Sequence, residues 1–216
     1  MDKSDVWQAI HTERAALADL LETLEPAEWV RPSLCEGWRV REVAAHVISS
    51  AEAGLAPLVS AMIRARGRFH RLTDLEARRL GARSPAEIVA DYRRLDGSRH
   101  HPPGTTVLDP LLDVLVHTQD IAVPLGRRHA MPVDAARVAA GRVQRLPGFF
   151  FPSRRLVSEV RLHATDTAWS TGSGPVVEGP MQALLLLMAG RHSAALPALT
   201  GDGLEHLTRR LATAKR

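Results

Sequence analysis

The spacing of apolar residues along the chain predicts a protein built mainly from α-helices. Between residues 4 and 24 the apolar side chains recur every three or four positions, which is the period of one helix face. Pro26 follows, so we expect this first helix to end before it. Residues 40–66 show the same period and predict a long second helix, which Pro57 can kink.

Two later segments carry the signals with which helices begin. In "SPAEIVADYRRLDG", Ser84 caps a predicted helix and Glu87, three residues later, completes a capping box. The segment "DPLLDVLVHTQDIAVPLG" repeats this pattern, with Asp109 as the cap and Pro110 in the first helical position. A further helix is expected at about residues 133–146. The first two thirds of the chain are therefore predicted to be helical.

The last third of the chain has a different pattern. Val160 and Leu162 show partial alternation and precede a turn-rich "STGSGP" and a β-branched "PVV", which together predict a small strand pair or meander. The run "MQALLLLMAG" predicts a buried helix closed by Gly190, and residues 204–214 predict a final surface helix.

We therefore expect two domains, a helical one at residues 1–150 and a small α+β one at residues 151–216. A piece of about 65 residues with so few strands buries too little apolar surface to be stable alone. The small domain is accordingly expected to pack against the helical one.

The composition is typical of a globular protein without a membrane segment. Of the 216 residues, 45% are hydrophobic and 24% charged, and no apolar run approaches the roughly 20 residues that a membrane span requires. The N-terminal segment is acidic and has no apolar core, so it does not predict a signal peptide. The single cysteine, Cys35, cannot form an internal disulfide and is expected to be a buried thiol. These features predict a cytoplasmic protein with no membrane partner.

Arginine supplies nearly all of the positive charge, since Lys3 and Lys215 are the only lysines in a chain of net charge +4. The densest basic cluster is "RARGRFHR", with the arginines Arg64, Arg66, Arg68 and Arg71. One interleaved aromatic residue is weak support for nucleic-acid binding. A solvated helix end is the favoured interpretation, and no nucleic-acid partner is expected.

Three polar residues interrupt the aliphatic run "LLDVLVHTQD". Asp113, His117 and Asp120 are separated by four and three positions, so they lie on one face of the predicted helix. Most of this helix should be buried, and a charged residue there needs a partner. From the spacing alone, the favoured interpretation is the narrow solvent face of a bundle helix. The alternative is that Asp113 and His117 converge on a divalent metal.

A metal site would need a third ligand from another helix, and His46 in "VREVAAHVISS" is the candidate. Taken alone, His46 is more typical of a core histidine. Two imidazoles and one carboxylate suit a catalytic zinc, because three protein ligands leave the fourth position open. The net charge of about +1 would favour an anion there, and a bound thiol or water would lose its proton near neutral pH.

Three segments resemble one known family, and together they span most of the chain. They are "EWVRPSLCEGWRVREVAAHV", "LLDVLVHTQDIAVPLGR" and "LHATDTAWSTGSGPVVEGPMQALLLLMAGR". They look like the mycothiol-dependent maleylpyruvate isomerase family. The resemblance implies a mainly α fold, in which a DinB-like four-helix bundle carries a small α+β C-terminal domain.

The resemblance also implies a site and a chemistry. A divalent metal, usually zinc, is held by His46, Asp113 and His117, and mycothiol supplies its thiol to the open position. The thiolate then adds to a small electrophilic substrate. At a maleyl-type double bond, addition allows rotation and elimination restores the other isomer, whereas other members of the family transfer the thiol.

The chain departs from the family at Asp113, where a glutamate is expected. The shorter side chain requires the helix to lie closer to the metal or to bind it through water. Asp120 can accept a hydrogen bond from His117, as metal-bound histidines usually donate their second N–H, or it has a capping or surface role. Arg191 is a candidate catalytic residue that would hold a substrate carboxylate, with an exposed helix-end arginine as the alternative. Trp38 is interpreted as a packing residue that can also shape the cofactor pocket.

The leading prediction is a metal-dependent enzyme of the thiol-transferase or isomerase kind. Its partners would be a small electrophile and a low-molecular-weight thiol. The alternative is a noncatalytic metal-binding or ligand-binding regulatory module, because a fold does not fix a chemistry.

Overall fold

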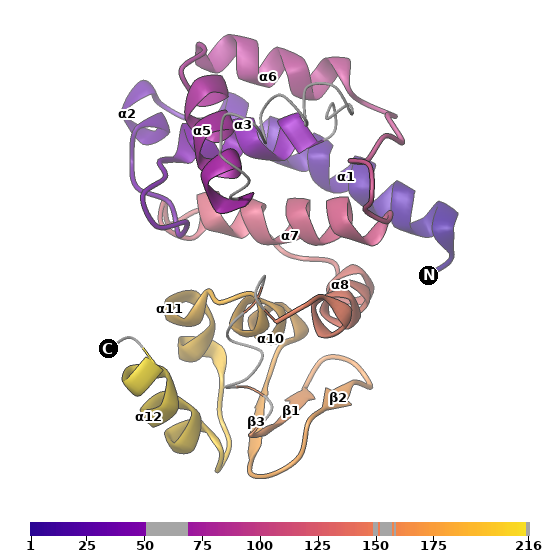
Figure 1. Cartoon of the computed structure of the whole chain (residues 1–216), viewed down its shortest axis with the longest axis vertical. Coiled ribbons are helices and arrows are strands. Elements are labelled where there is room, and N and C mark those ends of the chain that lie inside the picture. The colour runs from indigo at the N-terminus through magenta and orange to yellow at the C-terminus, as the bar shows by residue number, and fades with distance from the viewer. Residues whose placement is uncertain (51–68, 149–150, 152–156, 158, 215–216) are drawn as a thin grey trace. The chain divides into compact units, whose positions relative to one another are not determined.

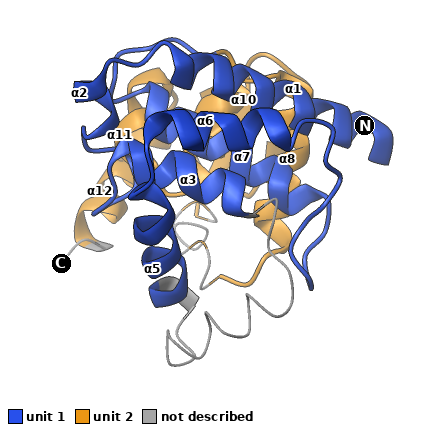
Figure 2. Ribbon diagram, turned by 90° about the horizontal axis from the view of Figure 1, so that it is seen from above, with its two compact units in different colours: residues 1–129 blue, residues 130–216 orange. Residues whose placement is uncertain are grey.

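The structure, a computed structural model, describes residues 1–50, 69–148, 151, 157 and 159–214. The chain divides into two compact units, at residues 1–129 and 130–216 (Figure 2). The second half of the helix predicted at 40–66, with Pro57 and the arginines at 64, 66 and 68, lies outside the described residues. Within the described ranges, no helix is long and apolar enough to cross a membrane.

The first unit contains a bundle of four helices (Figure 1). The first of them packs on the third and the fourth, and the second does the same, so the four close around one core. In chain order they are α1 (Lys3–Glu22), α3 (Val40–Ser50), α6 (Pro85–Arg94) and α7 (Leu108–Ala122). The predicted helical bundle is thereby confirmed.

The core of this bundle consists of the apolar faces that the sequence pattern predicted. It includes residues from all four helices, among them Leu17, Val43, Ile88, Val114 and Ile121, each at most 1% exposed. Burial of such side chains is the main favourable contribution to folding.

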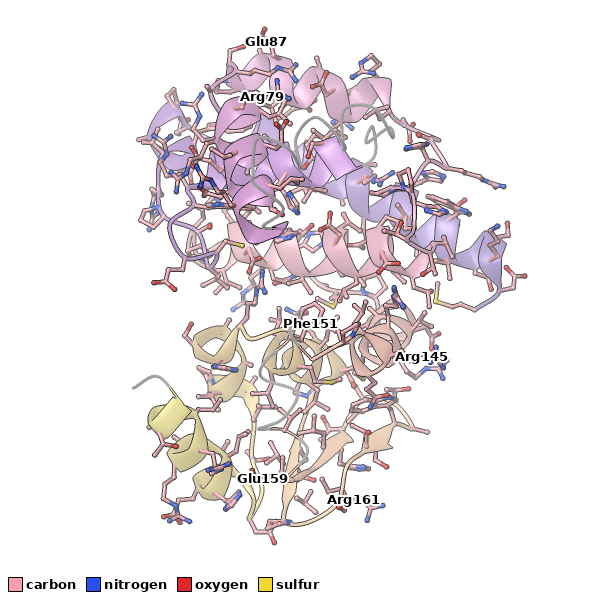
Figure 3. The ribbon with its side chains drawn as sticks, in the orientation of Figure 1. Arg79, Glu87, Arg145, Phe151, Glu159 and Arg161 are labelled. Atoms are coloured by element: carbon pink, nitrogen blue, oxygen red, sulfur yellow. The ribbon has the colours of Figure 1, made fainter. Side chains whose placement is uncertain are left out.

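The predicted start of α6 is confirmed, whereas α7 begins two residues before its predicted first residue, Pro110. Ser84 Oγ accepts from the Glu87 backbone N at 3.3 Å, and Glu87, labelled in Figure 3, accepts from the Ser84 backbone N at 2.8 Å. Asp109 instead lies inside the first turn of α7, and its Oδ2 accepts from the Thr106 backbone N at 2.6 Å. The carboxylate bonds back to the preceding loop, so the helix begins at Leu108 rather than after Asp109.

The sequence pattern did not predict two further helices of this unit, α2 (Pro26–Trp29) and α5 (Phe69–Gly81). The second packs closely on α3. A Cβ at Gly81 would come within 3.1 Å of the Glu42 Cα, so the absence of a side chain at Gly81 permits this approach. The last residues of the arginine-rich segment interpreted as a solvated helix end, Phe69 to Arg71, begin this packed helix, and the rest of the segment lies outside the described residues.

The second unit combines helices with a three-stranded sheet. The strands β1 (Arg161–Ala164), β2 (Ser170–Thr171) and β3 (Val176–Gly179) have the order β2-β1-β3. β1 pairs antiparallel with β2, as the predicted strand pair requires, but it pairs parallel with β3. The expected meander is therefore wrong for β3. In a meander β3 would pair with β2, but here the chain returns after β2 and β3 pairs with the other edge of β1.

The helices described in the second unit are α8 (Val133–Arg145), α10 (Met181–Met188), α11 (His192–Ala195) and α12 (Leu204–Ala214), with a 3-10 turn at Leu196–Ala198. Three of them, α8, α10 and α12, lie close to their predicted positions, whereas α11 was not predicted. α10 packs on α8 and on the sheet, which groups α8 with this unit. The domain boundary at 150/151 stays a prediction.

Candidate metal centre

Helices α3 and α7 bring the three predicted metal ligands together. Asp113 Oδ1 lies 3.3 Å from His46 Nε2 and 3.4 Å from His117 Nε2. One ligand atom from each residue lies within 4.8 Å of the others. Asp113 and His117 face the same way because they are one helical turn apart on α7. His46 joins them because α3 packs on α7.

These side chains do not form a solvent face, which the spacing alone had favoured. They are 14–21% exposed, and Asp120 is fully buried. The stripe on α7 points into the bundle because the described helices α1 and α3 both pack on it.

The donor set and its spacing fit a small divalent cation. Zinc binds imidazole nitrogen and carboxylate oxygen at about 2.0–2.1 Å, so two ligand atoms of a tetrahedron lie about 3.3 Å apart. The two observed separations, 3.3 and 3.4 Å, have this size. A charge-assisted hydrogen bond would be shorter, at about 2.7–2.9 Å. The three residues therefore have both the chemistry and the spacing of a three-ligand site.

The charges of the cluster are strongly coupled. Burial alone would raise the pKa of Asp113, but His46 and His117 hold it well below its usual range. Burial alone would lower the pKa of His117, but Asp113, assisted by Asp120, raises it well above its ordinary value. The Asp113 carboxylate is therefore ionised, and the cluster favours a positive charge beside it.

Asp120 fixes the orientation of the His117 ring. Its Oδ2 lies 2.8 Å from His117 Nδ1, so Nδ1 donates to it and Nε2 is left to face Asp113. Because Asp120 is fully buried, the alternative surface role is excluded. The loop before α3 holds Asp120 at two points: the Leu34 backbone N donates to the Asp120 backbone carbonyl, and the Cys35 thiol donates to Asp120 Oδ2 at 3.1 Å.

Cys35 lies closer to the candidate centre than the sequence suggested. The residue is half-buried, and its Sγ lies 3.6 Å from His117 Nδ1. Cys35, His117 and Asp120 also lie close enough together to share a cation. The 2.8 Å contact between His117 and Asp120 has the length of a hydrogen bond, which favours a supporting network over a second metal position. No local sequence signal marks this contact, because it joins the loop before α3 to the end of α7.

Two further predicted site residues lie in different parts of the molecule. The Trp38 ring is centred 5.2 Å from the His46 ring, and its Nε1 donates to Asp74 Oδ1. Arg191 belongs to the second unit, where it is half-buried at the start of α11 and its Nη1 donates to the Ala189 carbonyl at 2.7 Å. The roles of Trp38 in the cofactor pocket and of Arg191 in catalysis stay predictions.

Comparisons with known structures agree with the fold described above. Two crystal structures of a mycothiol-dependent maleylpyruvate isomerase, one of them with a histidine replaced by alanine, are 17% and 16% identical to the chain, with TM-scores of 0.65 and 0.64. Each comparison covers 94% of this chain and 93% of the other. At this identity they establish the fold, and the predicted DinB-like bundle with a small α+β part is confirmed.

Among curated proteins, none matches the sequence. The sequence profile of the mycothiol maleylpyruvate isomerase N-terminal domain matches residues 10–122, a range that contains His46, Asp113 and His117. That range is more than half of the 216 residues, and the chain therefore belongs to the mycothiol maleylpyruvate isomerase family.

Proposed function

We propose that the protein is a divalent-metal-dependent enzyme in which a mycothiol thiolate attacks a small electrophilic substrate. The observation that carries this proposal is the convergence of His46, Asp113 and His117 at the separations of a tetrahedral site. The isomerases of known structure named above support mycothiol as the thiol. Zinc is the expected metal, because two imidazoles and one carboxylate suit it.

The shorter Asp113 is compatible with direct ligation. A single oxygen, Oδ1, faces both histidine nitrogens at nearly equal distances. The packing of α3 on α7 therefore compensates for the methylene that glutamate would add.

When bound, the metal lowers the pKa of a thiol at the open position, so that the thiolate is present near neutral pH. The protein side chains contribute orientation. Asp120 accepts from His117 Nδ1 and keeps Nε2 directed at the site. Arg191 is proposed to hold a carboxylate of the substrate, since a guanidinium matches a carboxylate with two parallel hydrogen bonds.

The thiol sulfur adds to the electrophilic carbon of the substrate. With a maleyl-type double bond, the adduct rotates about the former double bond and loses the thiol again, which gives the other isomer. With other electrophiles, the adduct is the product and the reaction is a thiol transfer.

The first test is metal content. The purified full chain should bind about one divalent ion per molecule by mass spectrometry of the metal, and His46→Ala should bind none. His100→Ala, which removes an exposed histidine of the loop after α6, is the matched control and should keep its metal. The proposal fails if carefully prepared wild-type protein holds no divalent ion and takes up none that is added.

The second test separates the enzyme from a noncatalytic regulatory module on the same scaffold. Mycothiol consumption is measured with a panel of electrophiles that includes a maleyl compound. Turnover that requires both the metal and His46 supports the enzyme. Saturable binding of mycothiol without turnover of any electrophile favours the module.

A further inference from the structure

A small cavity lies between α1 and α6 in the first unit. Its volume is about 60 Å³, and its lining includes Arg14, His11, Tyr92 and Asp96. None of the three candidate metal ligands lines it. The cavity is therefore distinct from the candidate metal site.

Arg14 is a buried cation whose hydrogen-bonding capacity is not satisfied. The residue is 5% exposed, and its Nε and Nη1 atoms have no hydrogen-bond partner within the described part of the chain. The other arginine of the lining, Arg93, donates to Asp19 and Glu22. A buried charge without a partner is costly, and such groups in native proteins usually have a ligand, an ion or water beside them.

The charges around Arg14 leave it uncompensated. Burial lowers the pKa of Arg14, and the charge of Asp113 offsets only part of that effect. Asp113 is already engaged by His46 and His117 at the candidate metal centre. Asp96, the carboxylate of the lining, is exposed. Among the described residues, Arg14 therefore has no carboxylate of its own as an ion-pair partner.

His11 adds a second unpaired group to the same lining. Its Nδ1 is covered by protein and has no partner among the residues described. Burial lowers the pKa of His11, and Arg14 lowers it further, so the ring is neutral near neutral pH and can donate one N–H. The Tyr92 hydroxyl, by contrast, already donates to the Ala44 carbonyl at 2.7 Å. Arg14 and His11 are thus the donors that this cavity offers to a ligand.

The size of the cavity limits the ligand to a small group. A cavity of about 60 Å³ has room for a small ligand only. A carboxylate group has about this size, is planar, and accepts two parallel hydrogen bonds from a guanidinium. We propose that the cavity between α1 and α6 is a carboxylate-binding site, in which Arg14 is the principal donor and His11 assists. This site has none of the candidate metal ligands in its lining, although the charge of Asp113 acts on Arg14.

The test is a titration of the full chain with ¹³C-labelled formate and acetate at constant ionic strength, followed by carbon line broadening. Saturable binding is expected in the wild type. Arg14→Gln should weaken it roughly 10–100-fold, because a hydrogen bond to a charged group is lost from a buried site. Arg93→Gln is the matched control, since this arginine lines the same cavity but is bonded to Asp19 and Glu22, and it should bind like the wild type.

Two further variants keep the test decisive if Arg14→Gln does not fold. Arg14→Lys retains the charge but not the forked geometry, and it should bind more weakly than the wild type. Asp96→Asn removes a carboxylate from the lining and should bind more tightly. The proposal is overturned if the folded wild type shows no saturable binding, or if every Arg14 variant binds as well as the wild type.

Two sources can supply the carboxylate, a free small carboxylate or a carboxylate arm of the enzyme's substrate. If acetate competitively inhibits turnover of a carboxylate-bearing electrophile, the substrate is the source of the carboxylate. Acetate that binds without affecting turnover identifies a free carboxylate. Either result retains the site, and the binding titration itself does not depend on the protein being an enzyme.

Discussion

Helices α7 and α10 are both largely buried, but they differ in their polar residues. In α10 every residue except Gln182 is buried and apolar, and the Gln182 side chain accepts from the Met131 backbone N. In α7 His117 bonds Asp120, and Asp113 Oδ1 lies 3.3–3.4 Å from the Nε2 atoms of His46 and His117. An apolar pattern alone thus indicates burial, whereas a polar stripe within it indicates where the buried surface serves chemistry.

The largest effect is expected from removing a ligand on α7. His117→Ala takes one of three ligands from the proposed centre, so metal affinity should fall by more than the roughly 10–100-fold that loss of a supporting partner costs. Isothermal titration of the metal-free protein with zinc measures this change. Unchanged zinc affinity in folded His117→Ala would show that the polar residues of α7 do not bind the metal, and the contrast with α10 would be lost.

The corresponding change on α10 should affect stability and leave metal binding intact. Leu185 is fully buried, and Leu185→Ala should lower the free energy of unfolding by about 2–5 kcal/mol because a cavity remains. Urea unfolding measures this loss, and the zinc titration is repeated on the same sample. A loss of metal affinity equal to that of His117→Ala would contradict the distinction between the two helices.

The smallest effect is expected from a supporting residue. Asp120→Asn keeps the shape of the side chain but loses the charge that His117 Nδ1 faces, so zinc affinity should fall roughly 10–100-fold. Thr118→Val on the same helix is the control. It loses the hydrogen bond to the Val114 carbonyl, which should cost about 1 kcal/mol of stability without a change in zinc affinity. Equal zinc affinities for the two variants would remove Asp120 from the site.

Local periodicity was enough to predict those parts of the fold and the site that depend on neighbours in sequence. The i, i+4 spacing of Asp113 and His117 placed both on one face, and the capping box at Ser84 marked the start of α6. The segment of α5 was missed because its apolar residues are sparse among charged ones. The parallel position of β3 was missed because strand order is set by packing and not by the strand's own sequence.

Arg14 was missed although the sequence contains a signal. It lies four residues after Ile10 and three before Leu17, so it occupies the apolar stripe of α1. A charged residue in such a stripe is buried when the helix packs. By contrast, the contact of Cys35 with Asp120 joins segments far apart in the chain, and only the folded structure reveals it.

The loop that contains Leu34 also affects how the ligands find one another during folding. The Leu34 backbone N donates to the Asp120 carbonyl, and the Val40 backbone N donates to the Arg31 carbonyl at the start of α3. Once Leu34 is docked on α7, only a short stretch of chain separates it from His46. The entropy of closing a loop grows with its length, so the third ligand then has little conformational space left to search.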